Sequence, residues 1–281
     1  MPDRENLSLK PGSRCYGLKW YPCRVTNLCR PILSNSQFSS LDLVEPIQRA
    51  LTAEKHVAPT PIQAKAIPHL LQGRDLLGQA EAGAGKTVAF TLPILQHLSI
   101  DRHPAGPRKV RALILTTSRE RVQHIQESFR AYGRFVRLSQ VTVYEGPGKA
   151  AQAQALSRGI DILIGTPGRV VELINAGQLE LNKLEIMVLD ETDRMLELGV
   201  TNELRAIFEA APTERQTIVF ATTLPAEIKQ LADNLLTDPV TVLANPPAPR
   251  LITTAQSARI RDTEARRRVR DLLPERMASR R

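Results

Sequence analysis

The chain has no long hydrophobic run, and this absence limits the classes of protein to which it can belong. None of its apolar stretches approaches the roughly 18 residues that suggest a membrane span. Residues 1–30 carry scattered charges and no continuous apolar segment, which argues against a secretory signal. With 42% hydrophobic residues over 281 positions, the chain can still form one sizeable core. We therefore expect a cytoplasmic protein that does not use a membrane.

Cysteine is scarce, and its spacing excludes two common uses of this residue. The chain has three cysteines, at Cys15, Cys23 and Cys29, with no histidine nearby. An odd number does not suit a disulfide framework, and the spacing matches no common zinc pattern. We expect free thiols in a poorly ordered leader, residues 1–37.

The two ends of the chain have too few acidic residues to balance their basic ones. The net charge of +9 divides into +4 for residues 1–37, −1 for residues 38–245 and +6 for residues 246–281. We therefore expect a basic leader (1–37), a central domain (38–245) and an Arg-rich tail (246–281). Such ends can attract phosphate backbones without reading sequence, and solvated disordered tails are an equally good interpretation.

The central segment alternates short apolar runs with stretches of helical periodicity. This alternation predicts an α/β fold, a parallel sheet with helices on both faces. Ligands of such sheets bind beyond the carboxyl ends of the strands. Helical spacing also appears before residue 72, within 41–51 and 62–71. The later predicted strands are 111–116, 141–144, 160–164, 184–189 and 217–220, and the helices that follow them are 120–135, 149–158, 167–176, 202–211 and 225–236.

Residues 80–87, Ala-Glu-Ala-Gly-Ala-Gly-Lys-Thr, lie between a short apolar run and a helix-like segment, 88–98. Two glycines allow the backbone to curl, so that its N–H groups surround an anion at the helix N-terminus. Lys86 then reaches the outer phosphates, and the Thr87 hydroxyl can sit on a magnesium ion. A plain Gly/Ala turn before a helix is the alternative. The residues expected to bind nucleotide here are Ala82, Gly83, Ala84, Gly85, Lys86 and Thr87.

An acidic tetrad, Asp190-Glu191-Thr192-Asp193, directly follows the apolar run 186–189. A carboxylate at a strand end near bound phosphates can hold Mg²⁺, usually through water, and a second can polarise the attacking water. We assign Asp190 to the metal and Glu191 to the water. The alternative, an acidic turn that caps the next helix, suits Asp193.

Gln63 lies near the start of the helical segment 62–71, after Pro59-Thr60-Pro61. Its side-chain amide has the donors and the acceptor needed to read an adenine edge. A solvated helix residue is the alternative.

Taken in order, these segments resemble the first RecA-like domain of the DEAD-box RNA helicases, over residues 38–243. The phosphate loop of that family itself begins with alanine, as this one does at Ala80. Seven motifs in one order leave little room for coincidence. They are 59–63, which looks like the adenine-reading Q motif with Phe38 at its upstream aromatic position, 80–87, 117–120, 144–146, 166–169, 190–193 and 221–223.

The resemblance implies a RecA-like P-loop NTPase that uses ATP and Mg²⁺. Phe38 and Gln63 would bind the adenine, and Lys86 would act with Asp190 and Glu191 in catalysis.

The resemblance also implies RNA as a partner, held by its sugar–phosphate backbone without reading sequence. For Arg119 and Arg169 a buried structural arginine or a solvated one is the alternative. The residues implied in RNA binding are Arg119, Gly146, Thr166, Pro167, Gly168 and Arg169.

The family's second RecA-like domain is not found in the sequence. No His-Arg-x-Gly-Arg-x-x-Arg element follows residue 243, and Arg266-Arg267-Arg268 lacks its spacing and glycine. Loss of an arginine that stabilises the transition state lowers phosphoryl transfer by about 10³- to 10⁵-fold. We therefore expect weak ATP hydrolysis unless another protein supplies that domain. A non-hydrolysing RNA-binding or regulatory module is the second interpretation, and a truncated product with no retained role is the third.

Smaller departures from the family pattern affect the same sites. Glu145 replaces a glycine in a turn expected near RNA and adds a repelling charge. Ala221 lacks the hydroxyl that links the third motif to the acidic tetrad in the family. Thr192 brings a hydroxyl nearby, and we expect the two changes to compensate.

Overall fold

The structure is a computed structural model, and it describes residues 37–244. The predictions for residues 1–36 of the leader, for its three cysteines and for the tail 246–281 lie outside the described residues. Within residues 37–244, the helices are too short or too polar for any of them to cross a membrane.

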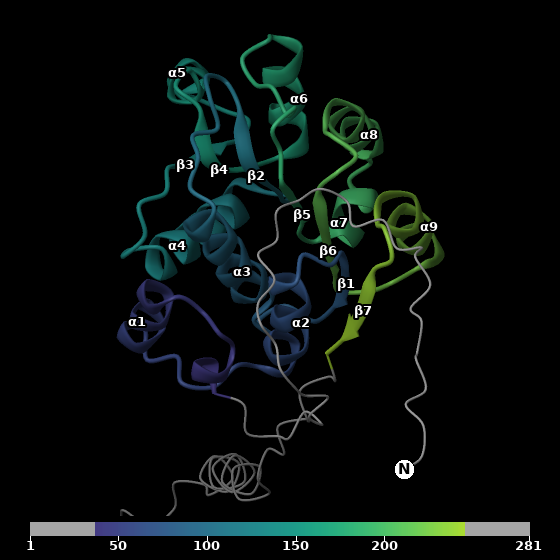
Figure 1. Ribbon diagram of the computed structural model, residues 1–281. Coiled ribbons are helices and arrows are strands. Elements are labelled where there is room, and N and C mark those ends of the chain that lie inside the picture. Colours follow the sequence, from purple (N-terminus) through teal and green to yellow (C-terminus); the bar gives the residue numbers. More distant parts are fainter. Residues whose placement is uncertain (1–36, 245–281) are drawn as a thin grey trace, which may run out of the picture. The chain divides into compact units, whose positions relative to one another are not determined.

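The described residues build a seven-stranded sheet in which every pair of neighbouring strands is parallel. The strand order is β3-β4-β2-β5-β6-β1-β7 (Figure 1). The strands are β1 (Leu76–Gln79), β2 (Val110–Leu115), β3 (Gln140–Val143), β4 (Ile160–Gly165), β5 (Ile186–Leu189), β6 (Gln216–Ala221) and β7 (Val240–Leu243).

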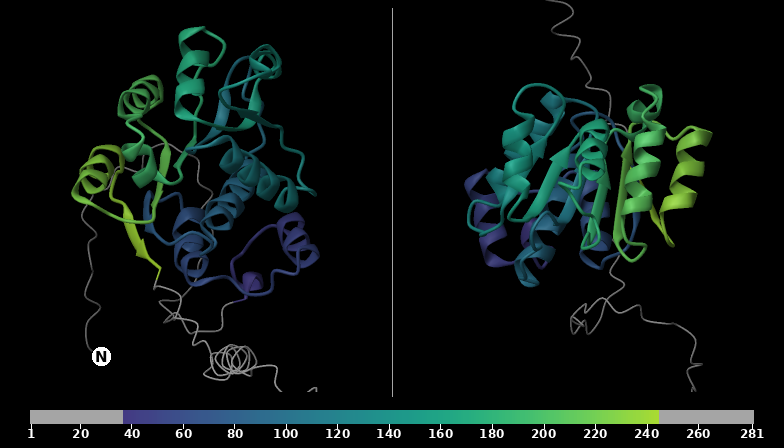
Figure 2. Two further views of the ribbon diagram at one scale, coloured as in Figure 1. Left: turned by 180° about the vertical axis from the view of Figure 1, so that it is seen from behind. Right: turned by 90° about the horizontal axis from the view of Figure 1, so that it is seen from above.

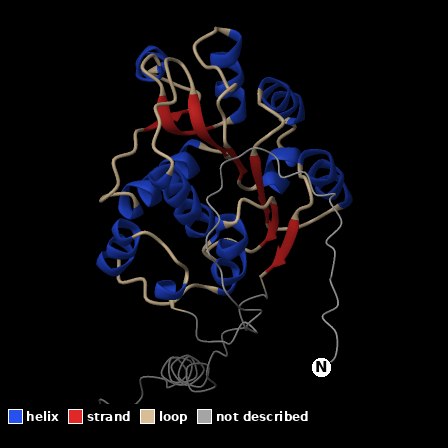
Figure 3. Ribbon diagram, viewed as in Figure 1, coloured by secondary structure: helices blue, strands red, loops and turns tan. Residues whose placement is uncertain are grey.

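Helices cover both faces of this sheet (Figures 2 and 3). A 3₁₀ turn (Phe38–Ser40), α1 (Glu45–Ala53), α2 (Pro61–Leu71), α3 (Lys86–Ile100) and α4 (Arg119–Tyr132) contribute to one hydrophobic cluster. The second cluster contains residues of α5 (Lys149–Leu156), α6 (Pro167–Asn175), α7 (Thr192–Glu197), α8 (Thr201–Ala210) and α9 (Ala226–Leu235).

Alternating side chains of the central strands feed these two clusters. In β2, Ala112 and Ile114 join the first cluster, whereas Leu113 and Leu115 join the second. Successive side chains of a strand point to opposite faces, so a strand covered on both faces reads as a continuous apolar run. This is why the central strands stood out in the sequence.

The predicted α/β fold with a parallel sheet and helices on both faces is confirmed, with two omissions. Strand β7 was not predicted, because it is a four-residue strand that pairs only with β1 and leaves Thr241 and Leu243 exposed. Helix α7 was also missed, because it has six residues, too few for helical periodicity to show. The predicted strand 184–189 begins two residues late, at Ile186, although Leu184 is buried.

Candidate nucleotide-binding site

The phosphate loop connects the end of β1 to the start of α3. Gly83 has a φ of 80° and Gly85 a φ of 95°, in the left-handed region that glycine adopts without strain. Lys86 and Thr87 open α3 and are only 5% and 7% exposed. The loop therefore has the curled backbone and the helix N-terminus that the sequence predicts for anion binding.

Helix α2 and its N-cap residue form hydrogen bonds with the phosphate loop. Thr60 donates its hydroxyl to the carbonyl of Ala84 at 2.8 Å, and Gln63 donates its amide to the carbonyl of Gly85 at 3.1 Å. The amide oxygen of Gln63 accepts the N–H of Thr60 at 2.9 Å. Gln63 therefore holds the loop, and adenine reading by this residue stays a prediction. Adenine binding by Phe38, which is 4% exposed and packs in the first hydrophobic cluster, also stays a prediction.

The acidic tetrad begins at the end of β5, at the same edge of the sheet as the phosphate loop. Asp190 is fully buried, and Glu191 has a left-handed φ of 59°. Burial raises the pKa of the Asp190 carboxyl above its usual range, while the charges of Arg121 and Lys86 oppose that rise. Thr117, after β2, donates its hydroxyl to Glu191 Oε2 at 2.5 Å.

Arg121, in the first turn of α4, lies among these groups, although the sequence analysis did not single it out. Its Nε lies 2.7 Å from Asp190 Oδ2, and its Nη2 lies 2.6 Å from the same oxygen. Nη2 also donates to the hydroxyl of Thr87 at 3.2 Å, and Nε lies 3.6 Å from Glu191 Oε1. Strands β2 and β5 are neighbours, so a basic residue just after β2 can reach groups just after β5, but the sequence alone does not give that strand order.

The candidate Mg²⁺ ligands therefore already hold a cation. Thr87 and Asp190 both contact the Arg121 guanidinium, so in this arrangement they do not fit a metal ion. Among the described residues, the three side chains whose geometry could hold a metal lie elsewhere and are Asp101, His103 and Glu185.

The other half of the tetrad connects β5 to β6. Asp193 Oδ2 accepts the backbone N–H groups of Thr222 and Thr223 at 2.9 and 3.0 Å. The buried hydroxyl of Thr192 donates to the carbonyl of Phe220 at 3.1 Å, next to Ala221. Thr192 thus provides a link beside the position where Ala221 has no hydroxyl.

Four of the predicted RNA-binding residues, 166–169, lie at the start of α6, and Glu145 lies beside them. Thr166 donates its hydroxyl to Glu145 Oε2 at 2.5 Å, and a Cβ built on Gly168 would lie 2.7 Å from Glu145 Oε1. Arg119 is exposed, with its guanidinium 5.0 Å from the centroid of the Tyr144 ring.

Arg169, in contrast, is 6% exposed and fully engaged within the protein. Its guanidinium donates to Gln152 Oε1, to Glu172 Oε2 and to the carbonyl of Lys149. These bonds join α5 to α6. They agree with the alternative interpretation, in which Arg169 is a buried structural arginine. RNA contacts by Arg119, by Arg169 and by Gly146, Thr166, Pro167 and Gly168 stay predictions.

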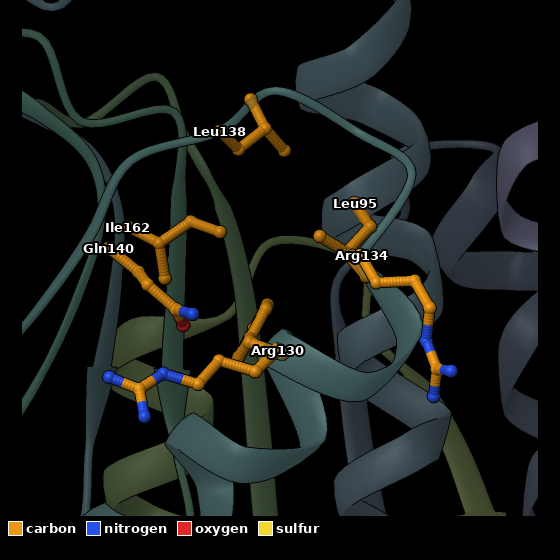
Figure 4. Close-up of a pocket in the computed structure, with 8 residues that line it drawn as sticks. Leu95, Arg130, Arg134, Leu138, Gln140 and Ile162 are labelled. Carbon is orange, nitrogen blue, oxygen red and sulfur yellow. The ribbon is translucent and has the colours of Figure 1, made fainter. Parts of the chain in front are cut away.

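One cavity lies away from these groups. It has a volume of about 210 Å³ and is drawn in Figure 4. Leu95 comes from the second half of α3, Gln140 begins β3 and Ile162 lies in β4, so the cavity is remote from the phosphate loop. It lies below the 300–1,000 Å³ that is typical of ligand pockets.

A parallel sheet with a phosphate loop after β1 and an acidic tetrad after β5 defines a RecA-like P-loop domain. The family model described as DEAD/DEAH box helicase matches residues 60–231, more than half of the sequence. The chain belongs to this family.

Curated relatives and a solved structure agree with this assignment. The chain is similar to the RNA helicase CrhR of Synechocystis sp., with 41% identity over 207 residues, covering 74% of this chain and 41% of the relative. The ATP-dependent RNA helicase DeaD of Escherichia coli is 38% identical over 203 residues, covering 72% of this chain and 32% of the relative. The chain thus spans less than half the length of these two relatives. The crystal structure of a DEAD box protein from Methanococcus jannaschii matches 74% of this chain and 56% of its own, with a TM-score of 0.69 and 30% identity.

Proposed function

We propose that residues 38–245 form the ATP-binding domain of a DEAD-box-type RNA helicase, which couples ATP hydrolysis to binding of an RNA backbone. The observation that carries this proposal is the meeting of the phosphate loop and the acidic tetrad at one edge of the sheet. Lys86 would contact the outer phosphates of ATP, and Glu191 would orient the attacking water. Thr117, which donates to Glu191, would fix the direction of that carboxylate.

Turnover by residues 38–245 in the absence of a second RecA-like domain is expected to be slow. The acceleration that an arginine finger supplies, about 10³- to 10⁵-fold, has to come from a second RecA-like domain. We propose that another protein supplies it.

RNA would bind near the start of α6 through backbone N–H groups and Arg119, without sequence preference. Arg119 supports this role, because its guanidinium is exposed beside Tyr144.

A second candidate function is a non-hydrolysing RNA-binding or regulatory module. One observation favours it: Arg121 contacts the hydroxyl of Thr87 and the carboxylate of Asp190, the groups proposed to hold Mg²⁺. The Arg121 guanidinium between these two groups would oppose binding of the metal that ATP hydrolysis would use.

An ATPase assay of the full chain with and without single-stranded RNA separates the two candidates, with Lys86→Ala as the control. RNA-stimulated hydrolysis that disappears in the control supports the enzyme. RNA binding without hydrolysis in either protein supports the module. No affinity for ATP or ADP at millimolar concentrations contradicts the site assignment itself.

A further inference from the structure

The Arg121 guanidinium lies where three oxygen-bearing side chains meet. Thr87 opens α3, Asp190 and Glu191 follow β5, and Arg121 reaches them from α4. Its distances are 2.6 and 2.7 Å to Asp190 Oδ2, 3.2 Å to Thr87 Oγ1 and 3.6 Å to Glu191 Oε1. A hydroxyl and two carboxylates are the kind of ligand set that a hard divalent cation prefers.

The fold fixes the position of the helix that carries this guanidinium. Val122, Ile125 and Phe129 anchor α4 in the first hydrophobic cluster, and Ser118 caps the helix by accepting the N–H of Arg121 at 3.2 Å. The side chain of Arg121 is 21% exposed, whereas that of Asp190 is completely buried. A buried carboxylate without a cation is costly, so Asp190 keeps Arg121 in place.

The guanidinium also retains donors for a ligand. Its contacts with the described residues use Nε and Nη2, and none of those contacts involves Nη1. Arginine binds phosphate oxygens through such planar N–H groups and keeps its charge at any physiological pH. Lys86, whose charge acts on the same Asp190 carboxyl, provides a second cation beside the phosphate loop.

We propose that Arg121 is an internal cation that replaces the divalent metal in nucleotide binding, so that the chain binds adenine nucleotides without Mg²⁺. This inference rests on the nucleotide binding proposed above and specifies its metal requirement. The guanidinium carries one positive charge instead of two, and it is attached to the protein instead of arriving with the nucleotide.

The test measures the affinity of the full chain for a fluorescent N-methylanthraniloyl-ADP, once in EDTA and once in MgCl₂. The wild-type Kd is expected to change less than about threefold between the two conditions. In Arg121→Met, which keeps the length and removes the charge, the Kd is expected to rise about tenfold or more in EDTA and to recover in MgCl₂, since about 1.4 kcal/mol corresponds to tenfold. Arg121→Lys keeps a charge and is expected to lie between the two proteins in EDTA.

Arg130→Met is the matched control, because Arg130 is an exposed arginine on the same helix and lies away from the phosphate loop. Its Kd is expected to equal that of the wild type in both conditions. Circular dichroism melting checks that each variant is folded. If Arg121→Met does not fold, the wild type and Arg121→Lys still decide the question in EDTA.

Three outcomes contradict the inference, and they differ in what else they contradict. A wild type that binds only in MgCl₂ overturns it and leaves the proposed function intact. Equal, metal-independent binding by the wild type and by Arg121→Met would show that Arg121 does not replace the metal in nucleotide binding. Absence of binding by every protein in both conditions overturns the inference together with the proposed nucleotide site.

Discussion

Glu145 is a single residue whose charge would oppose the RNA binding proposed at the start of α6. Its carboxylate accepts the hydroxyl of Thr166 and lies against Gly168, where the proposal places an RNA phosphate. A fixed negative charge repels that phosphate, and salt screens the repulsion. Glu145 thus competes with the ligand proposed for the same groups.

We expect Glu145→Gly and Glu145→Gln to increase the affinity for single-stranded RNA by about three- to tenfold at low salt, an effect that shrinks as salt is raised. Fluorescence anisotropy with a labelled oligonucleotide at two salt concentrations measures it. Glu127→Gln, which removes an exposed charge from α4, serves as the control. Unchanged affinity in both Glu145 variants would mean that RNA does not approach this turn.

Thr192 is the second residue whose effect can be measured alone. Its hydroxyl is buried and donates to the carbonyl of Phe220, which ties the acidic tetrad to β6. Thr192→Val keeps the shape and removes the bond, at a cost of about 1 kcal/mol. We expect weaker nucleotide binding in this variant and recovery when Ala221→Ser is added, as measured by a double-mutant cycle. An unchanged nucleotide affinity in Thr192→Val would exclude the compensation.

Residue types at strand ends could be predicted from the sequence, but their partners could not. The positions of Lys86, Asp190 and Glu191 at one edge follow from parallel strands and short loops. The ion pair between Arg121 and Asp190 depends on the angle at which α4 leaves β2 and on the rotamer of the Arg121 side chain. Sequence periodicity encodes neither of them. The same holds for Gln63, whose amide could be assigned a hydrogen-bonding role but not a partner.

At the scale of elements, one ion-pair cluster joins α3, β2 and the segment before β5. Glu185 lies 2.6 Å from the Nε of fully buried Arg111 and 2.7 Å from His97 Nε2. Burial alone raises the pKa of the Glu185 carboxyl, but hydrogen bonds and charges from His97 and Arg111 outweigh it and lower the pKa to about 2. The cluster lies at the opposite end of the strands from the phosphate loop, so it bears on stability.

The lowered pKa of Glu185 predicts a loss of stability in acid. A carboxyl whose pKa falls from 4.5 to about 2 on folding contributes fully above pH 4.5, and this contribution is lost as the pH falls toward 2. We expect a loss of about 2 kcal/mol from this group between pH 7 and pH 3. Urea unfolding at the two pH values measures it.

Two variants isolate that contribution. Glu185→Gln is expected to be less stable at pH 7, because Arg111 is left buried without its anion, and to lose less on acidification. Glu209→Gln, at an exposed position on α8, is expected to behave as the wild type. If Glu185→Gln and the wild type lost equal stability in acid, the carboxyl would not be responsible.

At the scale of the whole molecule, the proposed function gives the described domain one half of a site that a second RecA-like domain would complete. The order of motifs was enough to identify the fold, because strands buried on both faces and the loops that follow them leave a clear pattern. Under the two proposals, ATP binding and hydrolysis by the chain would depend on two positive charges outside that pattern. One is Arg121, which is present, and the other is an arginine that a second RecA-like domain would bring.

The proposed roles of these two charges lead to a prediction of how a second domain changes the rate of ATP hydrolysis. We expect the wild type to hydrolyse ATP slowly, and to gain little when the second RecA-like domain of a DEAD-box relative is fused after residue 281, because Arg121 keeps the metal ligands occupied. Arg121→Met with the same fusion is expected to gain up to about 10³-fold in Mg²⁺-dependent kcat, since both the metal and the arginine finger can then act. Fusions whose added domain lacks its arginine, or that also carry Lys86→Ala, are the controls and should stay slow. If the kcat of the wild-type fusion rose as much as that of the Arg121→Met fusion, Arg121 would leave the metal ligands when ATP binds. The chain would then need only a second RecA-like domain for full activity.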